Sequence, residues 1–225
     1  MFQADYLVSR MMIFVPVLLS LSVHEWAHAW SAHKLGDDTA LHEGRMTLNP
    51  LSHIDPIGTV LLPLMGVPFG WAKPVPVNPA CFKRSVTMRQ GMMITAAAGP
   101  ISNVILGSAC MLLLAVLMVF QPGPFEYRQA VQQLLQQLVG INTALAVFNM
   151  LPIHPLDGSR VADALMPRRL RPQWEQFQRI GPIALVCVLI LPRMMGFSLF
   201  SWAFRLVYLF QAALIYLLSM LRGAG

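Results

Sequence analysis

Five apolar stretches, separated by polar segments, account for most of the chain. Each approaches or exceeds the roughly 20 residues that a helix needs to cross the hydrocarbon core of a bilayer. They cover residues 6–33, 91–120, 131–153, 179–195 and 197–221. The last two are joined by a short turn at residues 195–196. The pattern predicts an all-α polytopic membrane protein with about five transmembrane helices.

Two shorter segments have a different pattern. Residues 57–69 are apolar but too short to span, and they contain Pro63 and Pro68, so we expect a short re-entrant segment there. The stretch TALHEGRMTL at residues 39–48 has Gly44 between two short pieces that tolerate β-structure, which predicts a small β-hairpin. No internal repeat or long linker divides the chain, so we expect a single membrane-embedded domain over residues 1–225.

The composition agrees with a membrane location. Hydrophobic residues make up 56% of the chain and charged residues only 12%, whereas soluble domains carry about 25% charged residues. The first apolar stretch lacks the basic start and the cleavage site of a signal peptide, so we expect it to remain in the mature protein. The three cysteines are scattered and indicate neither a disulfide framework nor a cysteine metal motif.

The net charge of +6 reflects membrane topology better than nucleic-acid binding. Nine of the 16 Lys and Arg residues lie in two loops, at residues 73–89 and 160–179, and the positive-inside rule places both loops in the cytoplasm. The stretch at 91–120 then runs outward and the stretch at 131–153 runs inward. If residues 57–69 dip into the membrane and return, the stretch at 6–33 runs inward as well. The ends of these two inward helices are therefore expected at the same, cytoplasmic depth.

A polar cluster, HEWAH at residues 24–28, lies near the end of the first apolar stretch. On a helix His24 and His28 share one face and can present two imidazoles to one metal ion. Glu25 points aside, where it can act as a general base on a water molecule beside the metal, as in the HExxH motif of zinc enzymes. Ionisable residues in a spanning segment indicate a functional site, so we predict a metal site.

Catalytic zinc normally has a third protein ligand, and three candidates are present. His33 would lie on the opposite face of the helix from His24, nine residues earlier. Glu43 is a loop residue that can supply a carboxylate from the following segment. Asp157, in FNMLPIHPLDGSR, ends the second inward helix at the depth of the histidines, and topology favours it.

These residues resemble the site-2 protease family of intramembrane zinc metalloproteases, whose two signatures are HExxH and NxxPxxxLDG. The second signature matches at all its fixed positions, which are Asn149, Pro152, Leu156, Asp157 and Gly158. Three further stretches, GRMTLNPLSHIDPIGT, GWAKPVPVNP and AAAGPISN, are similar to the compact bacterial or archaeal members without PDZ or CBS domains. The resemblance covers about residues 15–165.

The resemblance implies that His24, His28 and Asp157 bind one zinc ion per chain and that Glu25 is the catalytic base. It also implies that Asn149 lies beside the site and holds the substrate backbone or the developing oxyanion. Further polar residues are candidates to support the site: His154, Asn49, His53, Asp55 and Asn103. Of these, His154 is a candidate for a second oxyanion donor. The catalytic core would span about residues 6–165, and a C-terminal helix pair about 179–221.

The function expected from these features is intramembrane endopeptidase activity in the inner (plasma) membrane of a bacterium or archaeon. The substrate would be a single-span membrane protein, cut within or near its transmembrane segment, with release of a cytoplasmic fragment. An extended substrate segment would dock on the edge of the predicted hairpin. The alternative is a membrane metal transporter or sensor with the same ligands, which would have no need of Glu25. We expect contact with lipid and none with nucleic acid, and the sequence indicates no oligomeric state.

Overall fold

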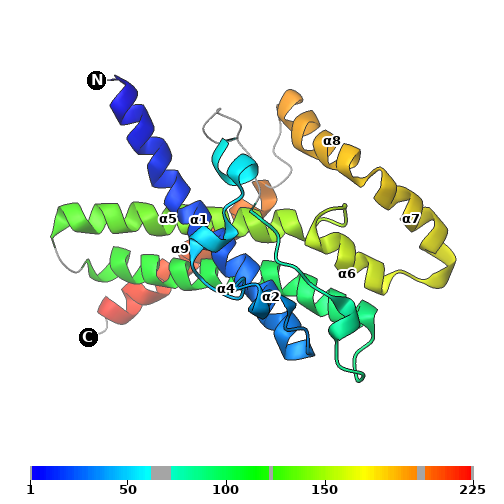
Figure 1. Ribbon diagram of the computed structural model, residues 1–225. Coiled ribbons are helices and arrows are strands. Elements are labelled where there is room, and N and C mark those ends of the chain that lie inside the picture. Colours follow the sequence, from blue (N-terminus) through cyan, green and yellow to red (C-terminus); the bar gives the residue numbers. More distant parts are fainter. Residues whose placement is uncertain (1, 62–71, 122–123, 197–200, 224–225) are drawn as a thin grey trace. The chain divides into compact units, whose positions relative to one another are not determined.

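The computed structural model describes residues 2–61, 72–121, 124–196 and 201–223. It is mostly helical, and the residues that it describes form no β-strand (Figure 1). The long helices are α1 (Phe2–Leu35), α4 (Met88–Phe120), α5 (Phe125–Asn149), α8 (Gly181–Met194) and α9 (Ser201–Gly223). The short helices and helical turns are α2 (Thr39–His42), η1 (Pro50–His53), η2 (Pro56–Leu61), η3 (Pro79–Cys81), α6 (Asp157–Leu165), η4 (Arg168–Leu170) and α7 (Arg171–Arg179).

Each of the five predicted apolar stretches coincides with a helix. Among the described residues, α4 and α9 are by themselves long and apolar enough to cross a membrane. The segment from η4 to α8 makes a third candidate if its bent pair of helices counts as one span. The chain is therefore a membrane protein rich in apolar helices, while the number of five spans stays a prediction.

The predicted hairpin at residues 39–48 is wrong. Thr39–His42 form one helical turn, α2, and the chain from there to Asn49 contains no strand. The Asp37 carboxylate accepts hydrogen bonds from the backbone N–H and the hydroxyl of Thr39, which favours a helical start over an extended strand. Gly44, with φ +66°, then ends the turn. Of the predicted re-entrant segment, residues 57–61 lie in η2 and residues 62–69 lie outside the described ranges.

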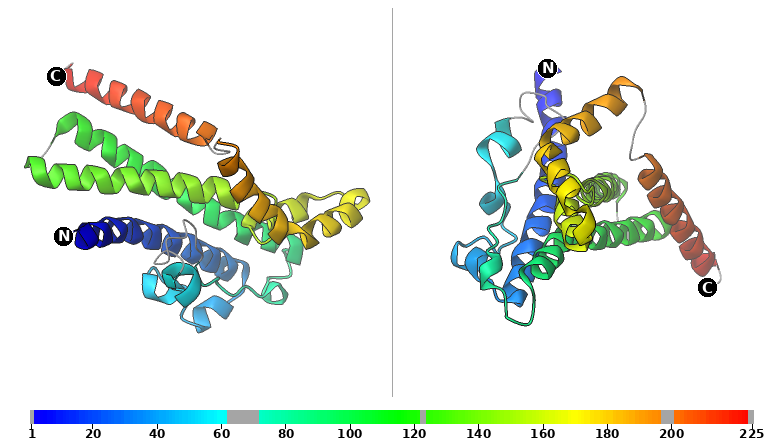
Figure 2. Two further views of the ribbon diagram at one scale, coloured as in Figure 1. Left: turned by 90° about the horizontal axis from the view of Figure 1, so that it is seen from above. Right: turned by 90° about the vertical axis from the view of Figure 1, so that its right-hand side faces the viewer.

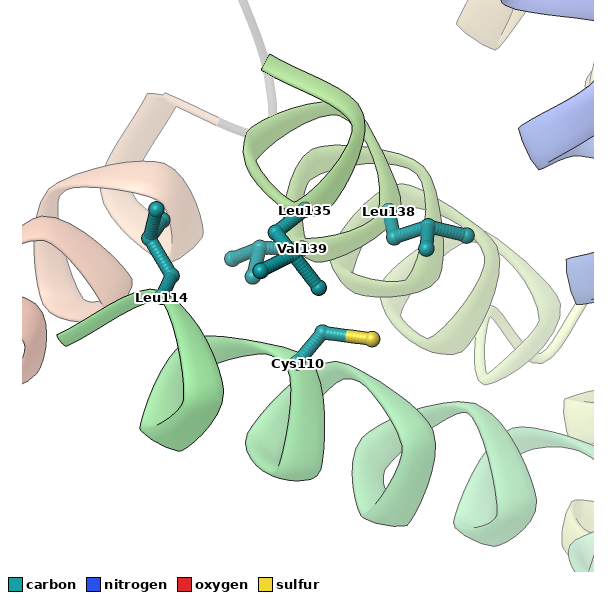
Figure 3. Close-up of a cluster of buried hydrophobic side chains, with 5 residues drawn as sticks. All are labelled: Cys110, Leu114, Leu135, Leu138 and Val139. Atoms are coloured by element: carbon teal, nitrogen blue, oxygen red, sulfur yellow. The ribbon is translucent and has the colours of Figure 1, made fainter. Parts of the chain in front are cut away.

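The chain divides into two compact units. The first unit comprises residues 1–20, 103–147 and 190–225, and the second comprises residues 21–102 and 148–189. Within the first unit, α5 lies alongside the second half of α4 (Figure 2). Five side chains from these two helices form the apolar core of this unit (Figure 3): Cys110, Leu114, Leu135, Leu138 and Val139.

The first unit also contains a buried polar cluster, formed by Ser20, Asn103 and Asn142. All three side chains are fully buried. The Asn103 amide donates to Asn142 Oδ1 at 2.8 Å and to the Ser20 carbonyl at 3.3 Å, and the Asn142 amide donates to Ser20 Oγ at 2.9 Å. Side-chain hydrogen bonds of this kind join transmembrane helices. The cluster therefore connects α1, α4 and α5 within this unit.

Candidate metal centre

The second unit holds the two histidines of the HEWAH motif on one face of α1. His24 and His28 are one helical turn apart, and both side chains are buried. Their Nε2 atoms lie 3.0 Å apart, and the two rings meet edge to face. Because residues four apart in a helix project from the same face, this proximity follows directly from the helical conformation of residues 24–28.

Asp157 approaches the histidines from a distant part of the chain. It is the first residue of α6, after the turn that follows α5. Its Oδ2 lies 3.2 Å from His24 Nε2 and 3.3 Å from His28 Nε2. The next residue, Gly158, permits this turn, because a Cβ atom there would lie 2.3 Å from the Met150 carbonyl oxygen. The predicted convergence of Asp157 with the two histidines is confirmed.

The three ligand atoms have the spacing that a tetrahedral zinc ion requires. Zinc bonds of about 2.0–2.1 Å to nitrogen and oxygen place neighbouring ligand atoms of a tetrahedron about 3.3 Å apart. The observed separations of 3.0, 3.2 and 3.3 Å are close to this value. Two imidazoles and one carboxylate are also a donor set that catalytic zinc uses. The residues present therefore fit a zinc ion, which His24, His28 and Asp157 would hold.

Electrostatics favour an ionised carboxylate at this position. Burial raises the pKa of the Asp157 carboxyl, but hydrogen bonds and charge from His24 and His28 lower it by more. The net result is a pKa well below the usual range of an aspartate. Asp157 thus remains an anion and a competent metal ligand throughout the neutral range.

The orientation of His28 is fixed by a hydrogen bond on the far side of its ring. Its Nδ1 lies 2.7 Å from the backbone carbonyl oxygen of Thr95 in α4. A carbonyl accepts only, so in the neutral form of His28 the proton is on Nδ1, and Nε2 of that form has its lone pair available to a metal ion. A hydrogen bond of this kind from a histidine to a carbonyl is typical of metal sites.

Gly99 in α4 makes room for both histidines. A Cβ atom at this position would lie 2.4 Å from His28 Nε2 and 2.6 Å from His24 Cε1. No side chain larger than hydrogen fits there without displacing an imidazole. The sequence analysis gave Gly99 no role of its own, although a Gly-Pro pair inside an apolar helix is a signal of close approach.

The carboxylate of Glu25 contacts an extended, proline-rich segment, residues 73–79. The backbone N–H of Val75 donates to Glu25 Oε2 at 2.9 Å. A second attachment lies three residues later, where the Asn78 N–H donates at 2.6 Å to Oδ2 of Asp37, two residues after the end of α1. Prolines at 74, 76 and 79 favour an extended chain. The segment therefore runs along α1 and orients the predicted base.

Arg45 holds the beginning of this proline-rich segment. Its Nη2 donates to the carbonyl oxygens of Lys73 at 2.5 Å and Pro74 at 3.2 Å. The side chain is buried and forms no ion pair with any carboxylate that the structure describes. Neither Arg45 nor Val75 was expected from the sequence, because the first sits in a loop motif without recognisable chemistry and the second acts through its backbone.

The remaining predicted catalytic residue, Asn149, is the last residue of α5 and is half-buried. It belongs to the same unit as the three ligands, and its role stays a prediction. His154 is exposed in the turn after α5, where its carbonyl oxygen packs closely against Gly181. This contact gives His154 a structural place between α5 and α8, and no described contact joins its ring to the ligands.

Three other predicted residues shape the chain between α2 and the end of η2. Asn49 Oδ1 accepts the N–H of Leu51 at the start of η1, and Asp55 Oδ1 accepts the N–H groups of Ile57 and Gly58 at the start of η2. His53 is buried and donates from Nε2 to the Thr47 carbonyl at 2.8 Å. These hydrogen bonds give the three side chains structural roles. Asn103 belongs to the polar cluster of the first unit.

The candidates that the sequence disfavoured as ligands lie elsewhere. His33 pairs with Asp38 at the end of α1, with Nδ1 2.5 Å from Oδ1. Glu43 follows α2 and is exposed. The only cluster of three or more potential ligands found among the described residues is His24, His28 and Asp157.

Comparisons with known proteins agree with this centre. The sequence profile of Peptidase family M50 matches residues 116–192, which include Asp157. The chain is 36% identical over 181 residues to the protein named "Putative zinc metalloprotease YwhC" of Bacillus subtilis, covering 80% of each chain. It is 29% identical over 194 residues to the protein named "Putative zinc metalloprotease Rip2" of Mycolicibacterium smegmatis, covering 86% of this chain and 70% of that one.

A further relative, Rip2 of Mycobacterium tuberculosis, is 28% identical over 200 residues, or 88% of this chain and 71% of that one. No solved structure matches the chain. The similarity to these relatives extends over most of the sequence, and the matched profile includes Asp157 of the cluster. From this similarity, the chain is a zinc metalloprotease that belongs to peptidase family M50, the site-2 protease family.

Proposed function

We propose that the protein is an intramembrane endopeptidase that holds one zinc ion per chain with His24, His28 and Asp157. The observation that carries the proposal is the convergence of three ligand atoms beside a carboxylate, Glu25, whose orientation a backbone N–H fixes. A protein that only binds or transports the metal has no use for an oriented base. Zinc in this position would make a nearby water molecule more acidic and polarise the carbonyl under attack.

The chain's own residues divide the remaining chemistry. Glu25 takes the proton from the attacking water molecule at its carboxylate and returns it to the leaving amine. The Val75 N–H occupies one lone pair of Oε2, and a carboxylate retains further acceptor sites for the proton. The Asn149 amide donates to the developing oxyanion. His154 is not needed for this scheme.

The substrate class follows from the setting of the site. The predicted base and two ligands lie in a helix rich in apolar residues, and a single-span membrane protein can approach such a site within the bilayer. A helical substrate hides its peptide bonds in its own hydrogen bonds, so it must unwind before cleavage. The hairpin that was expected to bind the unwound substrate segment is absent, because residues 39–48 form no β-strand. We therefore assign no docking strand for the substrate among the described residues. Substrates with added helix-stabilising residues at the cut are expected to react more slowly.

The experiment is a comparison of purified wild type and Glu25→Gln on membrane-spanning peptides, with zinc measured in both. The glutamine variant should retain zinc and lose roughly 10²–10⁴-fold in cleavage rate, the range typical of a general base. Glu43→Gln makes the same chemical change at an exposed residue and should cleave normally. Equal cleavage by wild type and Glu25→Gln would reject Glu25 as the base. No cleavage by either protein, with zinc bound in both, would favour the transporter or sensor instead.

The proposed orientation places the zinc centre toward the cytoplasm of a bacterial or archaeal inner membrane, with the cut fragment released there. Cys81 offers a direct test, because it is exposed in the basic loop at residues 73–89. A thiol reagent that cannot cross membranes should label it in inside-out vesicles and not in right-side-out vesicles, with Cys81→Ser as the blank. Labelling from the opposite side would reverse the topology.

A further inference from the structure

A basic elbow, defined as residues 168–180, joins α6 to the apolar helix α8 in the second unit. It contains η4 and α7 and four arginines, at positions 168, 169, 171 and 179, against one acidic residue, Glu175. Arg168, Arg169 and Arg179 are exposed. Arg89, by contrast, is paired with Asp163, whereas no arginine of the elbow pairs with a carboxylate among the described residues. The elbow is therefore a concentration of uncompensated positive charge.

The bend between α7 and α8 determines where these charges lie. The two helices are separated only by Ile180 and bend by 65°. Four arginines within 12 residues cannot lie in hydrocarbon, so the two helices do not form one broken span. When α8 enters the bilayer, α7 lies closer to the membrane plane than to its normal. The arginines are then at the depth of the lipid headgroups.

Exposed apolar side chains alternate with these arginines. Leu170 and Ile180 are 51% and 52% exposed and lie within the elbow, and Ile183 in the first turn of α8 is 69% exposed. Bulky apolar side chains beside arginines are typical of the membrane–water interface. There the apolar side chains enter the acyl region and the arginines reach the lipid headgroups. An aqueous surface that binds an acidic protein would have no use for these apolar groups.

We propose that the basic elbow is a docking surface for anionic phospholipid, with phosphate oxygens held by Arg168, Arg169 and Arg179 and with Leu170 and Ile180 inserted beside them. The elbow thereby anchors α8 at the membrane surface. The proposal concerns a surface of the chain and is independent of the peptidase mechanism.

The test uses the full-length protein in a non-ionic detergent, titrated with phosphatidylglycerol and followed by native mass spectrometry. Arg168→Gln/Arg169→Gln should weaken phosphatidylglycerol binding about 25-fold, because each basic residue near an anionic surface contributes about fivefold. The matched control is Lys73→Gln/Arg84→Gln, which removes the same charge from the other basic loop, also at exposed positions. The control should bind the lipid as tightly as the wild type. Equal binding by all three proteins would overturn the proposal.

Further arms distinguish the sources of negative charge. Phosphatidylcholine, which has no net charge, should not compete, and inorganic phosphate should compete only weakly. Competition by phosphate as strong as that by phosphatidylglycerol would show a site for a free anion and would overturn the lipid assignment. Tighter binding of a soluble poly-glutamate peptide to the same arginines would reassign the surface to an acidic protein partner. Unchanged zinc content and circular dichroism would show that each variant is folded.

Discussion

The protein contains two buried clusters of polar side chains, which differ in how their hydrogen-bond donors and acceptors are matched. In the first unit Ser20, Asn103 and Asn142 hydrogen-bond to one another, donor to acceptor, and the amides have matched partners. In the second unit His24, His28 and Asp157 point three lone-pair atoms at one location, within 3.3 Å of each other. The first arrangement is complete without any added group. The second brings acceptors together and gains stability when a cation lies between them.

The comparison shows that burial of polar groups in an apolar helix does not by itself indicate chemistry. Both clusters are buried, and both join helices that are distant in sequence. What distinguishes them is whether donors balance acceptors inside the cluster. A cluster in balance contributes to packing, and a cluster with excess acceptors predicts an ion. Variants of the two clusters should therefore separate into those that change zinc content and those that change only stability.

The largest effect is expected from removal of the third ligand. Asp157→Ala leaves two imidazoles, and zinc affinity should fall more than about 100-fold, because loss of even an indirect partner of a ligand costs 10–100-fold. Zinc content after dialysis against a graded series of chelators measures the loss, and peptide cleavage should disappear in parallel. An Asp157→Ala protein that retains stoichiometric zinc would show that the centre is held by other residues.

A substitution without any change of polarity should also affect the zinc cluster. Gly99→Ala places a methyl group 2.4 Å from His28 Nε2, so it must displace an imidazole, and we expect zinc affinity to fall about 10–100-fold. Gly140→Ala is the control, because nothing lies within 4 Å of the added carbon there. Zinc titration compares the two. If both alanine variants bind zinc like the wild type, the histidines do not pack on α4 as described.

A smaller effect is expected from the residue that supports the base. Arg45→Gln removes the hydrogen bonds to the carbonyl oxygens of Lys73 and Pro74 and should let the proline-rich segment move away from Glu25. The turnover number should fall about tenfold, equivalent to about 1.4 kcal/mol, with zinc content and KM unchanged. Arg84→Gln, at an exposed position, is the control. A loss of zinc in Arg45→Gln would instead mean that Arg45 supports the whole second unit.

The smallest effect belongs to the polar cluster of the first unit. Asn142→Leu keeps a side chain branched at Cγ and removes the hydrogen bonds to Asn103 and Ser20, which should lower the free energy of unfolding by about 1 kcal/mol, as for hydrogen bonds between transmembrane helices elsewhere. Denaturant unfolding in detergent measures this change. Zinc per chain should stay constant, and a variant that is stable but depleted in zinc would contradict the division between the two clusters.

The helices and the ligands were predictable for a common reason. An apolar run of about 20 residues predicts a helix directly from the composition of the run itself, and all five runs coincide with helices. His24 and His28 were predictable from a spacing of four on a helix. Asp157 was predictable as the third residue of the cluster because two inward helices were expected to end at the same depth. The distribution of arginines and lysines indicated this depth. The sequence determined the class of fold, the apolar helices and the three residues of the cluster, His24, His28 and Asp157.

Tertiary structure alone decided the parts that depend on contacts between distant segments. The hairpin prediction failed because Asp37, outside the predicted segment, starts a helical turn at Thr39. Gly99, Arg45 and the backbone of Val75 became recognisable only when α4 and the proline-rich segment were seen beside α1. A loop arginine and an amide N–H carry no chemical signature in a sequence, and a glycine in a helix suggests close packing without identifying the partner, because the function of all three comes from what they contact.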